Sequence, residues 1–184
     1  MSTLSAPFGL KPDYHPSGII RPAVYSILSG YATGILQNQP VKIGTNGTIE
    51  AAAIGDRFIG TFEGVQYTDT AGVRRYNNQW TASTAGTDIL ATVTLDPAQV
   101  YQIQANATMA VATIGEQFDF TTVTAGSTTT GLSALMLDVA SSAANASLRV
   151  IGLTPAADNA WGDAFPIVLV QISEHQFVAD RAAI

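Results

Sequence analysis

The sequence predicts an all-β protein, an antiparallel β-sandwich or barrel, on three observations. Short runs of alternating apolar and polar residues begin near Val24 and are separated by Gly, Asn-Gly and Asp-Pro clusters. No apolar stripe with helical spacing persists over the ~11 residues of a typical helix. The chain has 184 residues, of which 47% are hydrophobic, enough to bury the core of one domain. We therefore expect a single β domain over residues 24–184.

Residues 1–23 are expected to form an extended, Pro-rich N-terminal arm. Each proline restricts its own φ and disfavours helix at the residue before it. Four of the eight prolines fall in this segment: Pro7, Pro12, Pro16 and Pro22. Because apolar side chains are spaced along it, the arm is not a flexible linker, and we expect it to lie on a surface. Its candidate contact residues are Phe8, Leu10, Lys11, Tyr14, Ile19, Ile20 and Arg21.

The stretch "PVKIGTNGTIEA" predicts a β-hairpin. A three-residue loop at 45–47, with Gly47 in the left-handed conformation, places Ile43 opposite Ile49 and Lys42 opposite Glu50. Apolar side chains then share one face and an ion pair occupies the other. A two-residue Asn-Gly turn would set Ile43 against Glu50 instead, so the three-residue loop is preferred.

Further strands follow along the chain. Residues 57–69 and 73–80 are expected to pair as a second hairpin of open register, and "DILATVTLDP" alternates so that Ile89, Ala91, Val93 and Leu95 share one face. The stretches "VYQIQA", "EQFDFTT", "ALMLDVA" and "LRVIGL" predict four more strands. Residues 124–133 are a hairpin tip or a contact surface, and Trp161 is expected to pack over the edge of the core.

The densest apolar stretch, "DAFPIVLVQISEHQF" at 163–177, predicts a central strand whose polar second half leaves the core. Ser173 and His175 would lie ~7 Å apart along that strand, too far for direct proton transfer. No G-x-S-x-G motif surrounds the serine. We therefore expect no catalytic residues here, and we interpret His175, Phe177 and Val178 as candidates for contact with a neighbouring subunit.

Composition disfavours several classes of function. Eight Lys and Arg against 14 Asp and Glu give a net charge of -6, which would repel nucleic acid. The absence of cysteine excludes disulfides, thiolate chemistry and the usual zinc sites. "DNAWGD" lacks the alternation of a calcium loop, and no nucleotide-binding or metalloprotease motif is present. We expect no enzymatic activity, no metal, no cofactor and no membrane span, in a soluble protein that is not secreted.

Four stretches of the chain carry a family resemblance: "SGYATGILQNQPVKI", "AAAIGDRFIGTFEGVQYTDTAGVRRYNNQW", "DPAQVYQIQA" and "LRVIGLTPAADNAWGDAFPIVLVQISEHQF". They resemble the capsid decoration or cement proteins of tailed bacteriophages. The resemblance implies a β-sandwich or barrel, made in the host cytoplasm, that binds the outer surface of the virion capsid. Its partner would be the major capsid protein, and it would assemble as a homotrimer more readily than as a homodimer. It would clamp neighbouring capsomers against internal DNA pressure. The apolar, weakly basic composition of the N-terminal arm adds the expectation that the arm contacts the capsid. No catalytic residues are implied.

An alternative function is a tail- or fibre-associated module that recognises a host surface glycan. The uncharged polar composition favours it, together with three aromatic residues in the second hairpin: Tyr67, Tyr76 and Trp80. Aromatic residues at such positions also serve sheet packing, which is the competing interpretation.

Overall fold

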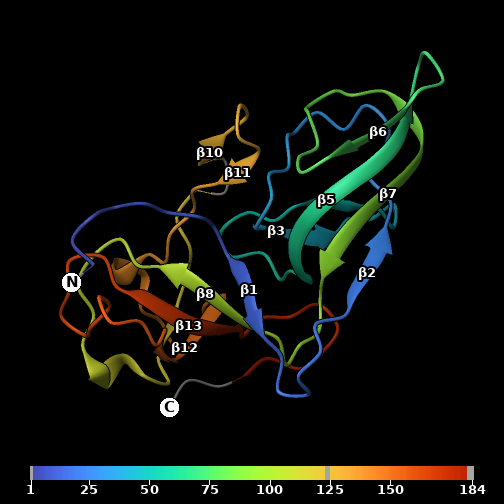
Figure 1. Cartoon of the computed structure of the whole chain (residues 1–184). Coiled ribbons are helices and arrows are strands. Elements are labelled where there is room, and N and C mark those ends of the chain that lie inside the picture. Colours follow the sequence, from blue (N-terminus) through green and yellow to red (C-terminus); the bar gives the residue numbers. More distant parts are fainter. Residues whose placement is uncertain (1, 123–124, 182–184) are drawn as a thin grey trace.

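The computed structural model describes residues 2–122 and 125–181, and its regular structure is nearly all β. A five-stranded and a six-stranded antiparallel sheet pack together, with a small two-stranded hairpin beside them (Figure 1). Two 3-10 turns, η1 (Val111–Thr113) and η2 (Val139–Ser141), are the helical elements of the described ranges. The all-β prediction is confirmed.

The five-stranded sheet has its most apolar strand in the middle. Its order is β1 (Lys11–Tyr14), β8 (Val100–Gln104), β13 (Ile167–Ile172), β12 (Leu148–Leu153) and β9 (Gln117–Phe118). Along β13, Val168, Val170 and Ile172 are buried and the residues between them are half-buried, as expected for a strand with one face on the core. Phe58 and Phe120 meet edge to face, with ring centroids 5.8 Å apart, in the same hydrophobic cluster.

The six-stranded sheet curls around a second hydrophobic cluster. Its order is β2 (Pro22–Tyr25), β7 (Gly86–Thr94), β5 (Gly60–Asp69), β3 (Gln39–Ile43) and β4 (Ile49–Ala51), with β6 (Arg74–Asn77) also paired to β5. The backbone N–H of Ile49 donates to the Ser26 carbonyl at 2.9 Å, so β4 at one end of the sheet contacts the chain just after β2 at the other. The sheet is therefore barrel-like. Phe62, Val93 and Trp80 are buried inside it.

Two glycines shape β5. A Cβ on Gly60 would lie 1.9 Å from the Thr94 carbonyl oxygen, so only glycine allows β5 to approach β7 this closely. The register between these strands shifts from Phe62 to Gly64, which leaves Glu63 as the extra residue of a β-bulge. The bulge re-aims the Glu63 side chain, with consequences for the outer surface described below.

Both predicted hairpins form. Ile43 pairs with Ile49 and Lys42 with Glu50, and Gly47 has φ 77°, as predicted for the three-residue loop. The ion pair differs, because Lys42 Nζ lies 2.7 Å from Asp56 Oδ2 rather than pairing with Glu50. In the second hairpin β5 and β6 set Gln66 opposite Tyr76, which fixes the register that the sequence left open. Ile89, Ala91 and Val93 are buried on one face of β7, and Leu95 packs against the same cluster, as predicted.

The N-terminal segment belongs to both sheets, which corrects the expectation of an arm apart from the body. β1 pairs with β8 at the edge of the five-stranded sheet, and β2 pairs with β7 at the edge of the six-stranded sheet. Leu10 is fully buried, and its N–H donates to the Asn38 carbonyl at 2.9 Å. The segment is extended, as its prolines require, but it lies on its own chain. The expected division between residues 23 and 24 falls inside β2.

Three further expectations have mixed outcomes. "ALMLDVA" is not a strand, because Leu137 forms only single bridges to Ala105 and Phe120 before η2 begins. Within 124–133, residue 124 lies outside the described residues, and the rest forms the hairpin of β10 (Gly126–Ser127) and β11 (Leu132–Ser133). Trp161 packs against the cluster of the five-stranded sheet, as predicted.

Candidate functional site

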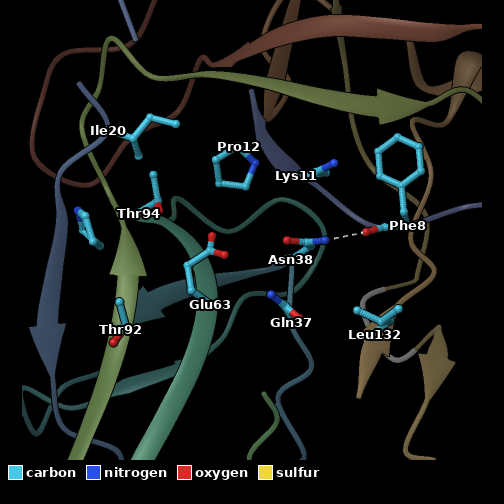
Figure 2. Close-up of a pocket in the computed structure, with 11 residues that line it drawn as sticks. Phe8, Lys11, Pro12, Ile20, Gln37, Asn38, Glu63, Thr92, Thr94 and Leu132 are labelled. Carbon is cyan, nitrogen blue, oxygen red and sulfur yellow. Dashed lines mark hydrogen bonds between the residues drawn. The ribbon is translucent and has the colours of Figure 1, made fainter. Parts of the chain in front are cut away.

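A groove of about 580 Å³ runs between the two sheets, over the outer face of the six-stranded sheet (Figure 2). β5 and β7 form its floor, and the N-terminal segment, the loop before β3 and the β10–β11 hairpin form its walls. We call it the Glu63 groove. The residues that line it are Phe8, Lys11, Pro12, Ile20, Pro22, Gln37, Asn38, Glu63, Thr92, Thr94 and Leu132.

Glu63 is the one carboxylate among the lining residues, and the bulge in β5 directs it into the groove (Figure 2). Burial raises the pKa of Glu63, and hydrogen bonds from the Thr61 and Thr94 hydroxyls offset only part of that effect. The Thr61 Oγ1 donates to Glu63 Oε1 at 3.1 Å. Within residues 2–122 and 125–181, Glu63 forms no ion pair. A partly desolvated acid therefore faces open space without a counter-charge.

The groove continues along the strands into a second hollow of about 480 Å³, which shares Glu63 and Thr92 with the first. β5 and β6 line this part with Gln66, Tyr76 and Asn77. The Tyr76 side chain is 72% exposed. Together the two hollows form one elongated depression with Glu63 near its middle.

Exposed apolar side chains lie on the outer face of β2 and β7 and in the loop that leads into β2, and Ile20 among them lines the groove. Val24 lies opposite Thr92, and Leu90 lies two residues before Thr92 on the same face of β7, so both stand on the outer face of the sheet. Ile19 and Ile20 are exposed in the loop that leads into β2. We call these four residues, Ile19, Ile20, Val24 and Leu90, the apolar rim. A group of exposed apolar side chains beside a groove is typical of a protein-binding surface.

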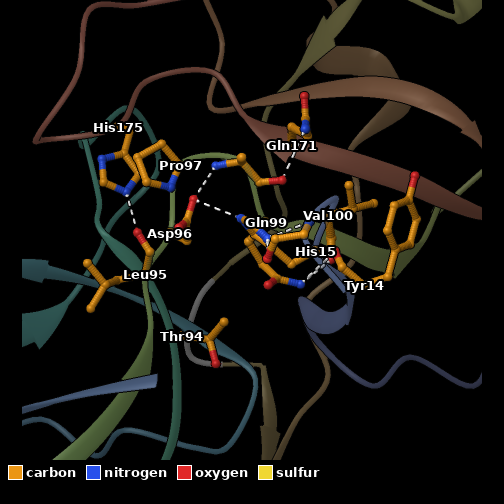
Figure 3. Close-up of polar contacts among 12 residues, drawn as sticks. Tyr14, His15, Thr94, Leu95, Asp96, Pro97, Gln99, Val100, Gln171 and His175 are labelled. Carbon is orange, nitrogen blue, oxygen red and sulfur yellow. Dashed lines mark hydrogen bonds and ion pairs between the residues drawn. The ribbon is translucent and has the colours of Figure 1, made fainter. Parts of the chain in front are cut away.

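A second polar region surrounds the connection between β7 and β8, at 95–99, where the chain passes from one sheet to the other (Figure 3). His15 Nε2 lies 3.2 Å from Asp96 Oδ1, and Gln99 Nε2 donates to the Tyr14 carbonyl at 3.0 Å. The N–H of Ala98 and the ring of His15 lower the pKa of Asp96. These contacts tie the N-terminal segment to the connection between the sheets.

His175 is a structural residue in this region. Its Nδ1 accepts from the Phe177 N–H at 3.1 Å, so Nε2 carries the proton and donates to the Leu95 carbonyl at 2.9 Å. Burial lowers the pKa of His175, which favours this neutral form. Both ring nitrogens are therefore engaged by backbone groups, and neither is free to accept a proton from Ser173.

The end of the C-terminal strand differs from the prediction. β13 stops at Ile172, and Ser173 and His175 are fully buried instead of leaving the core as a polar strand end. The reason is that the following residues turn towards the other sheet, where the Phe58 N–H donates to the Glu174 carbonyl at 3.3 Å. The sequence did not reveal this partner, because Phe58 is more than a hundred residues away.

The fold buries some of the predicted contact residues and exposes others. Among the C-terminal candidates, His175 is inaccessible, whereas Phe177 is 54% exposed and Val178 is also exposed. In the N-terminal segment, Leu10 is buried and Phe8 is half-buried in the groove wall. The exposed members of that set are Lys11, Tyr14, Ile19, Ile20 and Arg21.

The three aromatic residues of the second hairpin also differ in burial. Trp80 is buried in the barrel, and Tyr67 packs against it edge to face with ring centroids 5.4 Å apart. Only Tyr76 of the three presents its ring to solvent. Sequence reasoning missed Glu63, although a signal was present: the glycines that flank "TFE" in "GTFEG" mark a strand interrupted by a bulge.

In the part of the chain that the structure describes, no three His, Cys, Asp or Glu side chains gather to hold a metal ion. No helix among the described residues has the length and apolar character needed to cross a membrane. Comparisons with protein-family models, with curated proteins and with solved structures find nothing that matches this chain.

Proposed function

We propose that this chain is a structural virion protein that decorates the outside of a phage head and clamps neighbouring major capsid proteins. The observation that carries the proposal is the apolar rim beside the Glu63 groove, where Val24 and Leu90 are exposed on the outer face of the six-stranded sheet and Ile20 lines the groove. Apolar side chains at the centre of a contact supply most of its binding free energy. The resemblance to capsid decoration proteins supplies the identity of the partner.

The fold suits a clamp. β1 and β2 place the two halves of the N-terminal segment in different sheets, with Ile19 and Ile20 between them. A load applied at these two side chains is shared by the backbone hydrogen bonds of both sheets. In this proposal the capsid-contacting residues are the exposed part of the N-terminal segment, held by a folded body, and not a free arm.

The proposed assembly is a homotrimer. Phe177 and Val178 are exposed apolar residues on the C-terminal segment, separate in sequence from the rim, and serve as the proposed contact between subunits. Native mass spectrometry of the purified protein should give three times the 19.2 kDa chain mass. A Phe177→Ser, Val178→Ser double variant should dissociate to monomers, and an unchanged trimer would exclude this contact.

Co-sedimentation with purified heads tests the capsid contact. Replacing Ile19 and Val24 with Ser removes two rim side chains, each expected to contribute at least ~1 kcal/mol, so affinity should fall about tenfold or more. Ile54→Ser is the matched control, because Ile54 is 55% exposed like Ile19 but does not belong to the rim. Equal binding by the rim variant and wild type would contradict the proposal.

The glycan-binding alternative rests on Tyr76 and the amide groups near it. Copy number in purified virions separates the two functions, since a head decoration protein requires hundreds of copies and a tail module a handful. A handful of copies would replace the capsid proposal with the tail module.

A further inference from the structure

We propose that the Glu63 groove binds an Arg or Lys side chain carried by an extended segment of a partner polypeptide. The chemistry follows from the groove itself. Only the identity of that partner as the major capsid protein rests on the proposed function.

The first argument is charge complementarity. Glu63 is partly removed from water, receives hydrogen bonds only from hydroxyl groups, and has no ion-pair partner in residues 2–122 and 125–181. Lys11 also lines the groove but makes no ion pair with Glu63, and it is exposed to solvent on the wall formed by β1. A guanidinium or ammonium group placed at Glu63 would supply the missing counter-charge through charge-assisted hydrogen bonds.

The second argument is shape. Two hollows of about 580 and 480 Å³ meet at Glu63 and Thr92, so the depression is longer than one side chain needs and matches an extended segment. Apolar side chains stand on both sides of the carboxylate, with Ile20 on one wall and Leu132 on another (Figure 2). The aliphatic stem of an Arg or Lys residue can pack between such walls while its charged end reaches the acid.

The third argument is unused hydrogen-bonding capacity. The side-chain amides of Gln37, Gln66 and Asn77 line the depression on either side of Glu63, and none of them bonds to a described residue. By contrast, Asn38 Nδ2 already donates to the Phe8 carbonyl at 2.9 Å. The three free amides can each donate and accept, which suits the N–H and C=O groups of a bound backbone.

A polypeptide fits better than a glycan. Sugar rings stack on exposed aromatic faces, but of the two aromatic rings that line the depression Phe8 is half-buried, and Tyr76, at one end, is exposed. The walls of the groove also carry proline and aliphatic side chains, among them Pro12, Ile20 and Pro22. Such walls favour the stem of a basic side chain over the hydroxyl groups of a sugar.

Nuclear magnetic resonance titration of the full chain tests the site. The probe is the peptide acetyl-Leu-Arg-Leu-amide, and its uncharged counterpart carries citrulline in place of arginine. Wild type should bind the arginine peptide about tenfold more tightly or better, with shifts centred on Glu63, because a hydrogen bond between charged groups contributes ~1.5 to 3 kcal/mol. Glu63→Gln should abolish the preference, whereas Glu116→Gln, which makes the same charge change elsewhere, should keep it.

Several outcomes would overturn the proposal: no preference for arginine in wild type, a preference kept by a folded Glu63→Gln variant, or shifts outside the groove. Shifts of the same groove resonances by neutral maltotriose, without any by the arginine peptide, would make the groove a glycan site instead.

Co-sedimentation with purified heads provides the separate test of the partner. If wild type sediments with heads and Glu63→Gln does so equally, the capsid segment is excluded as occupant. If wild type does not sediment, the proposed function fails and the peptide result alone decides the groove.

Discussion

Replacing Leu10 with Ala should destabilise the whole molecule, although Leu10 stands in a segment that the sequence predicts to be an extended N-terminal arm outside the β domain. Leu10 is fully buried in the cluster of the five-stranded sheet, beside a β1–β8 pairing. Truncating a fully buried leucine costs about 2 to 5 kcal/mol, from lost apolar burial and the cavity that remains. For a chain of this length, a loss of about 3 kcal/mol lowers the melting temperature by roughly 6 to 12 °C.

Urea unfolding measures this loss. The chain has two tryptophans, and a Trp161→Phe background leaves Trp80, in the cluster of the six-stranded sheet, as the only tryptophan reporter. Leu10→Ala in that background should lower the midpoint seen by Trp80, because the N-terminal segment joins both sheets. Leu4→Ala, at a side chain 75% exposed, is the control and should change stability by less than ~0.5 kcal/mol. A Leu10 variant as stable as the Leu4 variant would refute the buried position of Leu10.

Three further changes have defined outcomes. Glu63→Gln should stabilise the protein at pH 7, because burial disfavours the charged form of Glu63 and raises its pKa. The gain should shrink as pH falls towards 4.5, because the native state of wild type takes up the proton at higher pH than the unfolded state does. Urea midpoints across that pH range measure the difference in stability. Because the pKa of His175 is lowered in the native state, its ring takes up a proton in the unfolded chain first as pH falls below the ordinary 6.5. Wild type should therefore lose stability in that range. A His175→Asn variant should show a flatter dependence of stability on pH. Gly60→Ala should lower the stability by about 1 to 3 kcal/mol or more, because its Cβ would lie 1.9 Å from the Thr94 carbonyl oxygen. Gly152→Ala is the control and should be tolerated, because a Cβ there would meet no atom within 4 Å. Thermal melts compare the two variants.

Short-range features of the fold were predictable because they depend on neighbouring residues. The pairing of Ile43 with Ile49 follows from a loop whose glycine takes φ 77°. The buried face of β7 follows from the period-2 pattern that places Ile89, Ala91 and Val93 on one side. In both cases the turn or the alternation specifies the structure, whatever the rest of the chain does.

The site was not predictable in the same way, because its parts come together only in three dimensions. The Glu63 groove combines β1, β5, β7 and the loop before β3, and nothing near Glu63 in the sequence points to Phe8 or Leu132. The N-terminal prolines correctly indicate extended chain, but extended chain serves equally as a free arm or as an edge strand. Burial of Leu10 in the core, and the pairing of Lys11 with Gln102 more than ninety residues away, decide between them.

The two hydrophobic clusters are held together by both ends of the chain. The N-terminal segment supplies a strand to each sheet, and the C-terminal segment crosses in the opposite direction, from β13 to the six-stranded sheet. There Gln176 Oε1 accepts from the Ile43 N–H at 2.7 Å and its Nε2 donates to the Ile43 carbonyl at 3.2 Å, so one side chain imitates a pairing strand residue. The sheets cannot separate unless these contacts break. The groove lies between the sheets, with its floor on one and part of its walls on the other, so the same contacts preserve its shape. Under the proposed capsid function the groove would bind while under load, and its place at this junction suits that role because a force that separates the sheets has to break these hydrogen bonds.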